Sequence, residues 1–172
     1  AKKINADKNI PKDPIRVDFE ALFIPDSGSR VKMITSQLAF YDIKDFKLLG
    51  TSLWNSPELL KNGVEYLNEA VFADSFFSDG FYPETTYFTD VYYTEYHRKP
   101  ENIDALAYDT AGIIFSILEN KDVKTRKDFA AGLMKLGYYS GATGSIYFDS
   151  KRVAQKTPFI IKVKDGKFEQ VK

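Results

Sequence analysis

The sequence predicts a mixed α/β fold in which short parallel strands alternate with helices. Three short apolar runs are each preceded or followed by a helical pattern, and turn residues separate them. The 172 residues are 44% hydrophobic and 28% charged, which is ordinary for a globular chain that builds its own core. Length predicts one domain, or about one and a half.

Residues 1–17 are polar and show no usable period, so we interpret them as a tail or an interlobe segment. The run from Phe19 to Ile24, closed by Pro25-Asp26, predicts a buried strand. A helical pattern follows Ser27-Gly28-Ser29. Ser27 or Ser29 is expected to cap this helix by accepting a bond from its free N–H groups.

The next two strands are predicted at residues 46–50 and 70–74. Residues 51–55 form a loop between them. Ser56-Pro57-Glu58 then predicts a helix start, with a hydroxyl cap, a proline at the first helical position and an acid in the first turn. Strands that alternate with helices pair in parallel through right-handed crossovers.

Three helices and a hairpin are predicted in the second half of the chain. The helices run from Pro83 to His97, from a cap at Asn102 to Leu118, and from Thr125, close to a capping box, to Gly137. Strands are predicted at 144–149, 158–163 and 168–171, and the Asp165-Gly166 pair between the last two indicates a tight turn.

Composition excludes several classes of function. Lys plus Arg number 24, and so do Asp plus Glu, so the balance indicates no nucleic-acid partner. Without cysteine there is no disulfide, no Cys-based zinc site and no thiol nucleophile. The single histidine, His97, stands at a helix end beside two cations and is interpreted as solvated. No phosphate-binding motif and no nucleophile–base pattern is present, which disfavours an enzyme.

The candidate binding residues lie in two loops that follow predicted strands. In open parallel sheets, ligands bind outside the carboxyl ends of the strands. The loops Asp26–Ser29 and Thr51–Ser56 are rich in hydroxyls and lead to predicted helix N-termini, which offer N–H groups to an anion. Trp54, the only tryptophan, is a candidate stacking wall for a ligand. The alternative is that the serines only cap helices and Trp54 packs on a neighbour.

The aromatic content is the unusual feature, with 14 Phe and 11 Tyr. Many of these rings gather between Phe72 and Tyr96. Most are expected to pack in a core or between lobes, because each ring buries a large area. The alternative is an aromatic binding surface.

The order of several motifs resembles the C-terminal half of a type I periplasmic binding protein of the branched-chain amino-acid receptor kind. The helix start Ala107-Tyr108-Asp109, the Gly141-x-x-Gly144-x-x-x-Phe148-Asp149 turn and the Val163-x-Asp165-Gly166-Lys167 ending carry most of the resemblance. Gln37-Leu38-Ala39-Phe40-Tyr41, followed by Gly50-Thr51-Ser52, is also similar to the lipoprotein activators of penicillin-binding proteins, which share that fold.

The resemblance implies a Rossmann-like, three-layer α/β/α lobe from a two-lobed receptor that closes on its ligand. Residues 18–80 would supply second-lobe β-α units, 81–137 helices that pack on the first lobe, and 138–172 the final strands and hairpin. The missing initiator Met and the polar start lead us to expect a fragment. The missing N-terminal lobe, or a second copy of the chain, is expected to cover its exposed aromatic surface.

The implied function is non-enzymatic, without cofactor or metal, and is located in the periplasm or at the outer membrane. The expected partners are a small polar, amino-acid-like ligand and an ABC permease. The alternative is a protein-interaction module that regulates a cell-wall synthase.

Carried over from the family, the ligand-binding candidates are Ser27, Ser29, Ser52, Leu53, Trp54, Asn55 and Phe77. Tyr108 and Asp109 match the family's helix start but are expected to serve packing. The acid that several amino-acid receptors place in the second loop is absent, and Glu58 is the nearest substitute.

Overall fold

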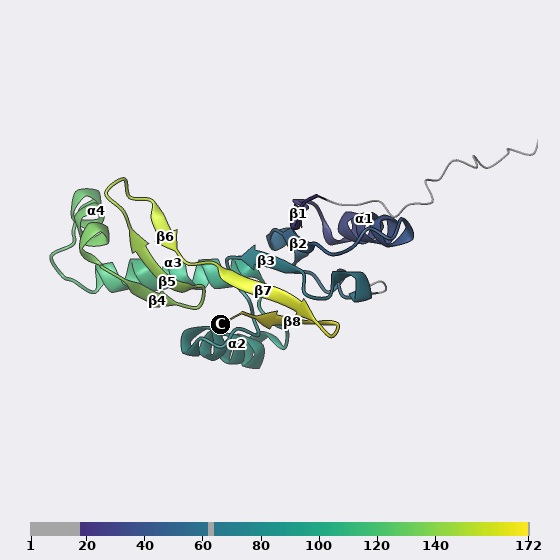
Figure 1. The fold of residues 1–172 in the computed structure, drawn as a ribbon. Coiled ribbons are helices and arrows are strands. Elements are labelled where there is room, and N and C mark those ends of the chain that lie inside the picture. The colour runs from purple at the N-terminus through teal and green to yellow at the C-terminus, as the bar shows by residue number, and fades with distance from the viewer. Residues whose placement is uncertain (1–17, 62–63, 172) are drawn as a thin grey trace, which may run out of the picture. The chain divides into compact units, whose positions relative to one another are not determined.

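A computed structural model describes residues 18–61 and 64–171 of the chain (Figure 1). These residues divide into two compact units. Unit 1 comprises the described residues up to Val71 together with Val163–Lys167, and unit 2 comprises Phe72–Lys162 and the residues from Phe168 onward. The segment 1–17, interpreted above as a tail or interlobe segment, lies outside the described residues.

Unit 1 contains the first predicted β-α-β unit. Strands β1 (Ala21–Phe23) and β2 (Lys47–Gly50) pair in parallel, with Ala21 opposite Lys47 and Phe23 opposite Leu49. Helix α1 (Gly28–Phe40) connects them. The parallel pairing and the intervening helix confirm the predicted arrangement. Two short 3₁₀ helices follow, η1 (Ser52–Trp54) and η2 (Val64–Leu67).

Three local predictions in unit 1 are wrong. Strand β1, which was predicted to be buried, exposes Phe23 by 57%. The predicted helix at Ser56 is a series of tight turns, in which Leu59 N–H donates to the Ser56 carbonyl and Leu60 N–H to the Pro57 carbonyl. These turns place Leu59 in the core, where it is fully buried. Ser27 does occupy the N-cap position of α1, but its hydroxyl makes no capping bond in the described structure and lies 3.2 Å from the Ser29 hydroxyl.

Strands β3 (Val71–Asp74), β7 (Phe159–Lys164) and β8 (Lys167–Gln170) lie side by side in that order. The boundary between the units cuts each of these strands. Asp165 and Gly166 join β7 to β8 with φ of 49° and 75°. Positive φ at both central residues is the geometry of a type I′ hairpin, which confirms the prediction from the Asp-Gly pair.

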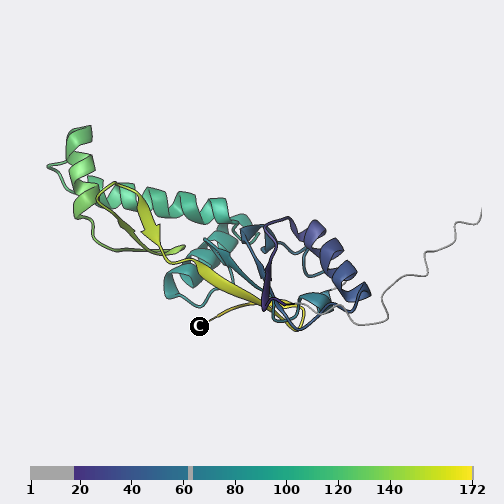
Figure 2. The ribbon, with the colours of Figure 1, turned by 45° about the horizontal axis from the view of Figure 1, so that its top comes forward.

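Unit 2 also contains helices α2 (Pro83–Tyr96), α3 (Asn102–Leu118) and α4 (Arg126–Lys135). A small antiparallel sheet joins β4 (Tyr139–Gly141), β5 (Gly144–Phe148) and β6 (Ala154–Lys156), and Figure 2 shows it beside the long helix α3. Thr125 caps α4 in a reciprocal box with Asp128, as predicted. The cap of α3 is Glu101, one residue before the predicted Asn102, because the Asp104 carboxylate reaches back to the Glu101 N–H.

The core of unit 2 is rich in aromatic rings but does not absorb all of them. Phe76 and Phe88 pack with Ala105 and Ala142, and a second cluster joins Ile113, Ile117 and Ile146. Five rings of the stretch between Phe72 and Tyr96, most of which was expected to pack in a core or between lobes, are exposed instead: Phe81, Tyr82, Tyr87, Tyr93 and Tyr96. Both packing and surface exposure therefore occur in this stretch. In the described part of the chain, no helix has the length and apolar character that crossing a membrane requires.

Candidate functional site

The two predicted loops lie at one edge of the β1–β2 pair, since parallel strands end on the same side. Two hydrogen bonds, one between backbones and one from a side chain, join the strand ends that lead into these loops. Ile24 N–H donates to the Leu49 carbonyl at 2.9 Å, and the indole Nε1 of Trp54 donates to the Ile24 carbonyl at 3.1 Å. Unit 1 therefore brings together Ser27 and Ser29 from one loop and residues 52–55 from the other.

Trp54 supports this edge from the inside. Its side chain is 0% exposed, and a β-carbon at Gly50 would collide with the indole ring. A stacking wall for a ligand needs an accessible ring face, so the position of the indole favours the packing alternative.

The accessible groups at the edge are polar with one apolar side chain. Ser29, Ser52 and Leu53 are exposed, Leu53 by 57%, while Ser27 and Asn55 are partly buried. The N–H groups in the first turn of α1 have no intrahelical acceptor. They therefore remain suitable for a carboxylate or another anion.

An acid stands beside these N–H groups. The carboxylate of Asp26 accepts a bond from the Ser27 N–H at 2.7 Å and lies 3.6 Å from the Arg30 guanidinium. Glu58, the substitute acid suggested by the sequence, pairs with Lys61 at 2.5 Å. That bond lowers the pKa of Glu58. Asp26 adjoins the helix start, and its ion pair with Arg30 is longer than that of Glu58 with Lys61, so Asp26 is the better candidate for a positively charged ligand group; the sequence analysis did not select it.

Phe77 belongs to unit 2 rather than to the unit that carries the two loops. Its side chain is 3% exposed, and its carbonyl accepts a bond from the Gly80 N–H at 2.9 Å. The structure therefore does not group Phe77 with the other candidate residues.

The end of β3 carries a polar network within unit 2. Asn102 donates through its amide to the buried Asp74 carboxylate at 2.8 Å and also to the Ser75 hydroxyl. The ammonium of Lys156 donates to the Ser75 carbonyl at 3.3 Å. Burial lowers the pKa of Lys156, although Asp109 and Asp74 oppose this effect. These bonds hold together the end of β3, the start of α3 and strand β6, which are distant in sequence.

A second buried acid joins α3 to the small sheet. Asp109 is 2% exposed and accepts bonds from Ala142 N–H, Thr143 N–H and the Thr143 hydroxyl at 2.7, 2.8 and 2.6 Å. Thr85 on α2 donates to the Ala142 carbonyl at 2.7 Å. Asp109 therefore serves packing, as expected.

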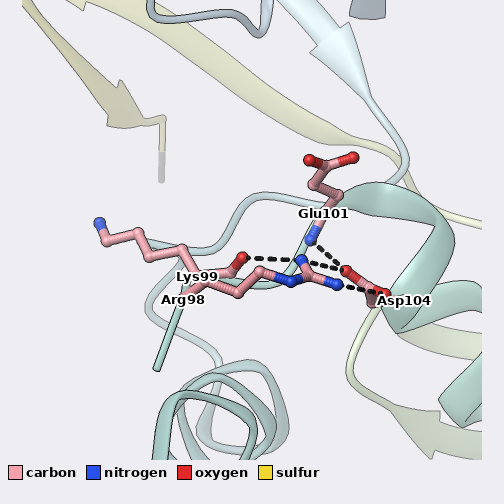
Figure 3. A network of polar contacts seen from close by, with 4 residues as sticks. All are labelled: Arg98, Lys99, Glu101 and Asp104. Atoms are coloured by element: carbon pink, nitrogen blue, oxygen red, sulfur yellow. Dashed lines mark hydrogen bonds and ion pairs between the residues drawn. The ribbon is translucent and has the colours of Figure 1, made fainter. Parts of the chain in front are cut away.

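A groove lies on α2 and α3 of unit 2 and includes part of the stretch for which the sequence analysis kept an aromatic binding surface as the alternative. The groove has a volume of about 960 Å³, and five of its twelve lining residues are aromatic; Arg98 and Asp104 also line it. Arg98 donates to both carboxylate oxygens of Asp104, at 2.9 and 3.3 Å (Figure 3). These bonds lower the pKa of Asp104 and raise that of Arg98. The i, i+4 spacing of Phe88, Tyr92 and Tyr96 was the available sequence signal.

Within residues 18–61 and 64–171, no cluster of His, Asp and Glu side chains is arranged to hold a metal ion. The described residues thus offer two loops with hydroxyl groups, buried structural acids and a groove lined in part by aromatic rings.

Comparisons with known proteins find solved structures of the same fold. A protein from Rhodospirillum rubrum assigned as a branched-chain amino acid ABC transporter matches with a TM-score of 0.81 at 22% identity, over 88% of this chain and 44% of that one. The leucine binding protein LivK from Thermotoga maritima matches with 0.67 at 23%, over 89% and 44%. LivJ from Streptococcus pneumoniae, in complex with isoleucine, matches with 0.65 at 24%, over 90% and 45%. No family model and no curated protein matches the sequence.

The chain thus has the fold of the type I periplasmic binding proteins, as the resemblance implied. Its structural neighbours include a branched-chain amino acid ABC transporter protein, a leucine binding protein and a branched-chain amino acid transporter substrate binding protein. The chain spans about 44% of the length of these neighbours.

Proposed function

We propose that the chain is a non-enzymatic solute-binding module that acts outside the cytoplasm on an amino acid or a similar small polar ligand. The observation that carries the proposal is the juxtaposition, at one sheet edge of a type I periplasmic binding fold, of Ser27, Ser29 and residues 52–55. Ligands of open parallel sheets bind at such an edge.

The chemistry of this edge suits an amphoteric ligand. The first-turn N–H groups of α1 and the serine hydroxyls would donate hydrogen bonds to the ligand carboxylate. The Asp26 carboxylate would attract the ammonium group, and Leu53 would contact an apolar side chain. The neighbours LivK, a leucine binding protein, and LivJ, in complex with isoleucine, support this class of ligand.

We further propose that the chain is part of a two-lobed receptor that closes on its ligand and delivers it to an ABC permease. Support comes from α3, which buries Ala105, Ile113 and Ile117 on one side yet exposes Ile103 by 69% and Phe115 by 65% on another. A helix that is apolar all round is typical of a fully buried position. The other lobe of such a receptor, or a second copy, would cover α3, and closure would shift the population toward the liganded form.

The other candidate is a protein-interaction module that regulates a cell-wall synthase. The exposed tyrosines of α2 favour it, because exposed aromatic patches commonly mark interaction sites. In that case variants of the α2 tyrosines would change partner binding, whereas variants of the unit 1 loops would not.

A thermal-shift screen of the twenty amino acids tests the proposal. A ligand that binds only the folded state at about ten times its Kd adds roughly 1.4 kcal/mol, which raises Tm by a few degrees. Ser29→Ala and Ser52→Ala should reduce the shift. Ser36→Ala, an exposed serine farther along α1, should leave it unchanged. No shift with any amino acid, or equal shifts in all variants, would remove the basis for the proposal.

A further inference from the structure

A buried hydroxyl at the end of β2 has no hydrogen-bond partner. Among the side chains that the structure describes, Oγ1 of Thr51 is the buried oxygen or nitrogen for which no bond is formed. An unpaired buried donor costs free energy, because it has lost its hydrogen bonds to water and gained none in return. Such exceptions are rare in native folds, so this one calls for an explanation.

Thr51 lies at the sheet edge that carries the proposed solute site. It follows Gly50, the last residue of β2, and it precedes η1, which contains Ser52 and Leu53. Thr51 occupies the N-cap position of η1, but its side chain makes no capping bond. The residue is only partly buried, so other atoms of Thr51 reach the surface. The unpaired oxygen therefore belongs to a residue of the site and not to one deep in the core.

The polar backbone groups at the two strand ends are already engaged. Ile24 N–H donates to the Leu49 carbonyl, and the Ile24 carbonyl accepts the indole N–H of Trp54. The Thr51 carbonyl accepts the backbone N–H of Trp54. Pro25, which follows Ile24, has no N–H to offer. A partner for the Thr51 hydroxyl therefore has to come from outside these strand ends.

We propose that Thr51 is a further ligand-binding residue of the unit 1 site, and that its hydroxyl turns outward to donate a hydrogen bond to an acceptor oxygen of the solute. A rotation of about 120° about the Cα–Cβ bond moves the oxygen to another staggered position and leaves the backbone in place. The carboxylate of an amino acid supplies two acceptor oxygens, whereas its ammonium group supplies none. The inference rests on the proposed function, because it assigns another contact to the same solute.

This arrangement has opposite consequences for folding and for binding. In the solute-free chain the unpaired hydroxyl lowers stability, and in the complex the same hydroxyl gains a bond. Thr51→Val keeps the shape of the side chain and removes the hydroxyl, so it should stabilise the free chain and weaken solute binding. The backbone at Thr51 is extended, with φ of −112° and ψ of 178°, which suits valine. A threonine with only a structural role would lose stability on this change and keep its affinity.

Two measurements on the full-length chain separate these effects. Urea unfolding followed by the fluorescence of Trp54, the single tryptophan, reports on unit 1. Calorimetric titration with L-leucine gives the Kd. We expect Thr51→Val to raise the urea midpoint by about 0.5 M and to weaken leucine binding about three- to tenfold. Thr51→Ser keeps the hydroxyl and should bind within about twofold of the unaltered chain.

Thr35 provides a matched control. It is a threonine of the same unit with 3% exposure, and its hydroxyl donates to the Lys32 carbonyl at 3.2 Å. Because Thr35→Val removes a hydroxyl that is bonded, it should not raise the urea midpoint, and it should leave the Kd for leucine unchanged.

Three results would overturn the inference while leaving the proposed function in place. The first is an unchanged Kd for Thr51→Val. The second is a lower urea midpoint for Thr51→Val, since the hydroxyl would then have a structural partner in the free chain. The third is equally weak binding by Thr51→Ser and Thr51→Val, since the hydroxyl would then not be the contact. Absence of leucine binding to the unaltered chain would refute the proposed function and this inference together.

Discussion

Replacing Asp109 by alanine should destabilise unit 2 more than any change of an exposed acid. The carboxylate is buried, and three hydrogen bonds reach it from Ala142 and Thr143, between 2.6 and 2.8 Å. The alanine variant would leave two backbone N–H groups and one hydroxyl without this acceptor. The position of the β4–β5 turn against α3 depends on these bonds.

The magnitude follows from the number of donors left unpaired. Each buried donor without an acceptor costs about 1–3 kcal/mol, so three donors with partial relaxation give a loss of about 4 kcal/mol. Asp109→Asn keeps the shape and one acceptor oxygen but turns an amide toward a backbone donor. Its cost should be about 2 kcal/mol. The exposed Asp90 on α2 is the control, and Asp90→Asn should change the free energy of unfolding by no more than about 0.5 kcal/mol.

Urea denaturation followed by circular dichroism at the helix band measures this effect. Of the four α-helices in the described residues, three lie in unit 2, so the signal reports mainly on that unit. With a urea slope of about 2 kcal/mol/M, the Asp109→Ala midpoint should fall by about 2 M. If Asp109→Ala stays within about 0.5 kcal/mol of the unaltered chain, the carboxylate is not the structural acceptor described here.

Three further changes test other parts of the account. Gly50→Ala should cost about 1–3 kcal/mol by overpacking and should shift the Trp54 fluorescence to longer wavelength, because a β-carbon would displace the indole; an unchanged spectrum would contradict this. The bond from Arg98 lowers the pKa of Asp104 in the folded chain. The Arg98–Asp104 pair therefore stabilises the fold above pH 3.8, and this stabilisation is lost as the pH falls through the lowered pKa of Asp104. Asp104→Asn should therefore lower stability at pH 7 by at most about 1 kcal/mol and make no difference in acid, in pH-dependent urea unfolding. Burial lowers the pKa of Lys156 in the folded chain, so the unfolded chain binds the proton more readily. The free energy of unfolding should therefore rise with pH between the lowered pKa and 10.5. Lys156→Met should remove this rise below pH 10.5.

Local sequence signals predicted most of the fold. The Thr125 box, Pro83 at the start of α2 and the Asp165-Gly166 turn each specify backbone geometry within a few residues, and all three occur as expected. Strands β4 and β6 were not predicted, because they are three residues long and half polar. At Ser56 a valid start signal was overridden, since burial of Leu59 favours a tighter turn.

The placement of the two candidate loops could be predicted, but the contacts of their side chains could not. Strand order placed the two loops at one edge, which follows from parallel pairing alone. The inward direction of Trp54 depends on the space left by Gly50 and on the carbonyl of Ile24, which are contacts that spacing does not reveal. The aromatic groove also depends on the packing of α2 beside α3, so only the repeat of rings along α2 was visible in the sequence.

The central claim is that the edge formed by the β1 and β2 loops binds a small amphoteric solute. An amide ¹H–¹⁵N NMR titration of the full-length chain with L-leucine tests it most directly, because it detects weak binding and locates it. The account predicts saturable shifts concentrated at residues 26–30 and 51–55, reduced by Ser29→Ala and unchanged by Ser36→Ala. Absence of shifts up to about 10 mM leucine, where even binding weaker than 1 mM is visible, or shifts confined to other residues, would contradict it.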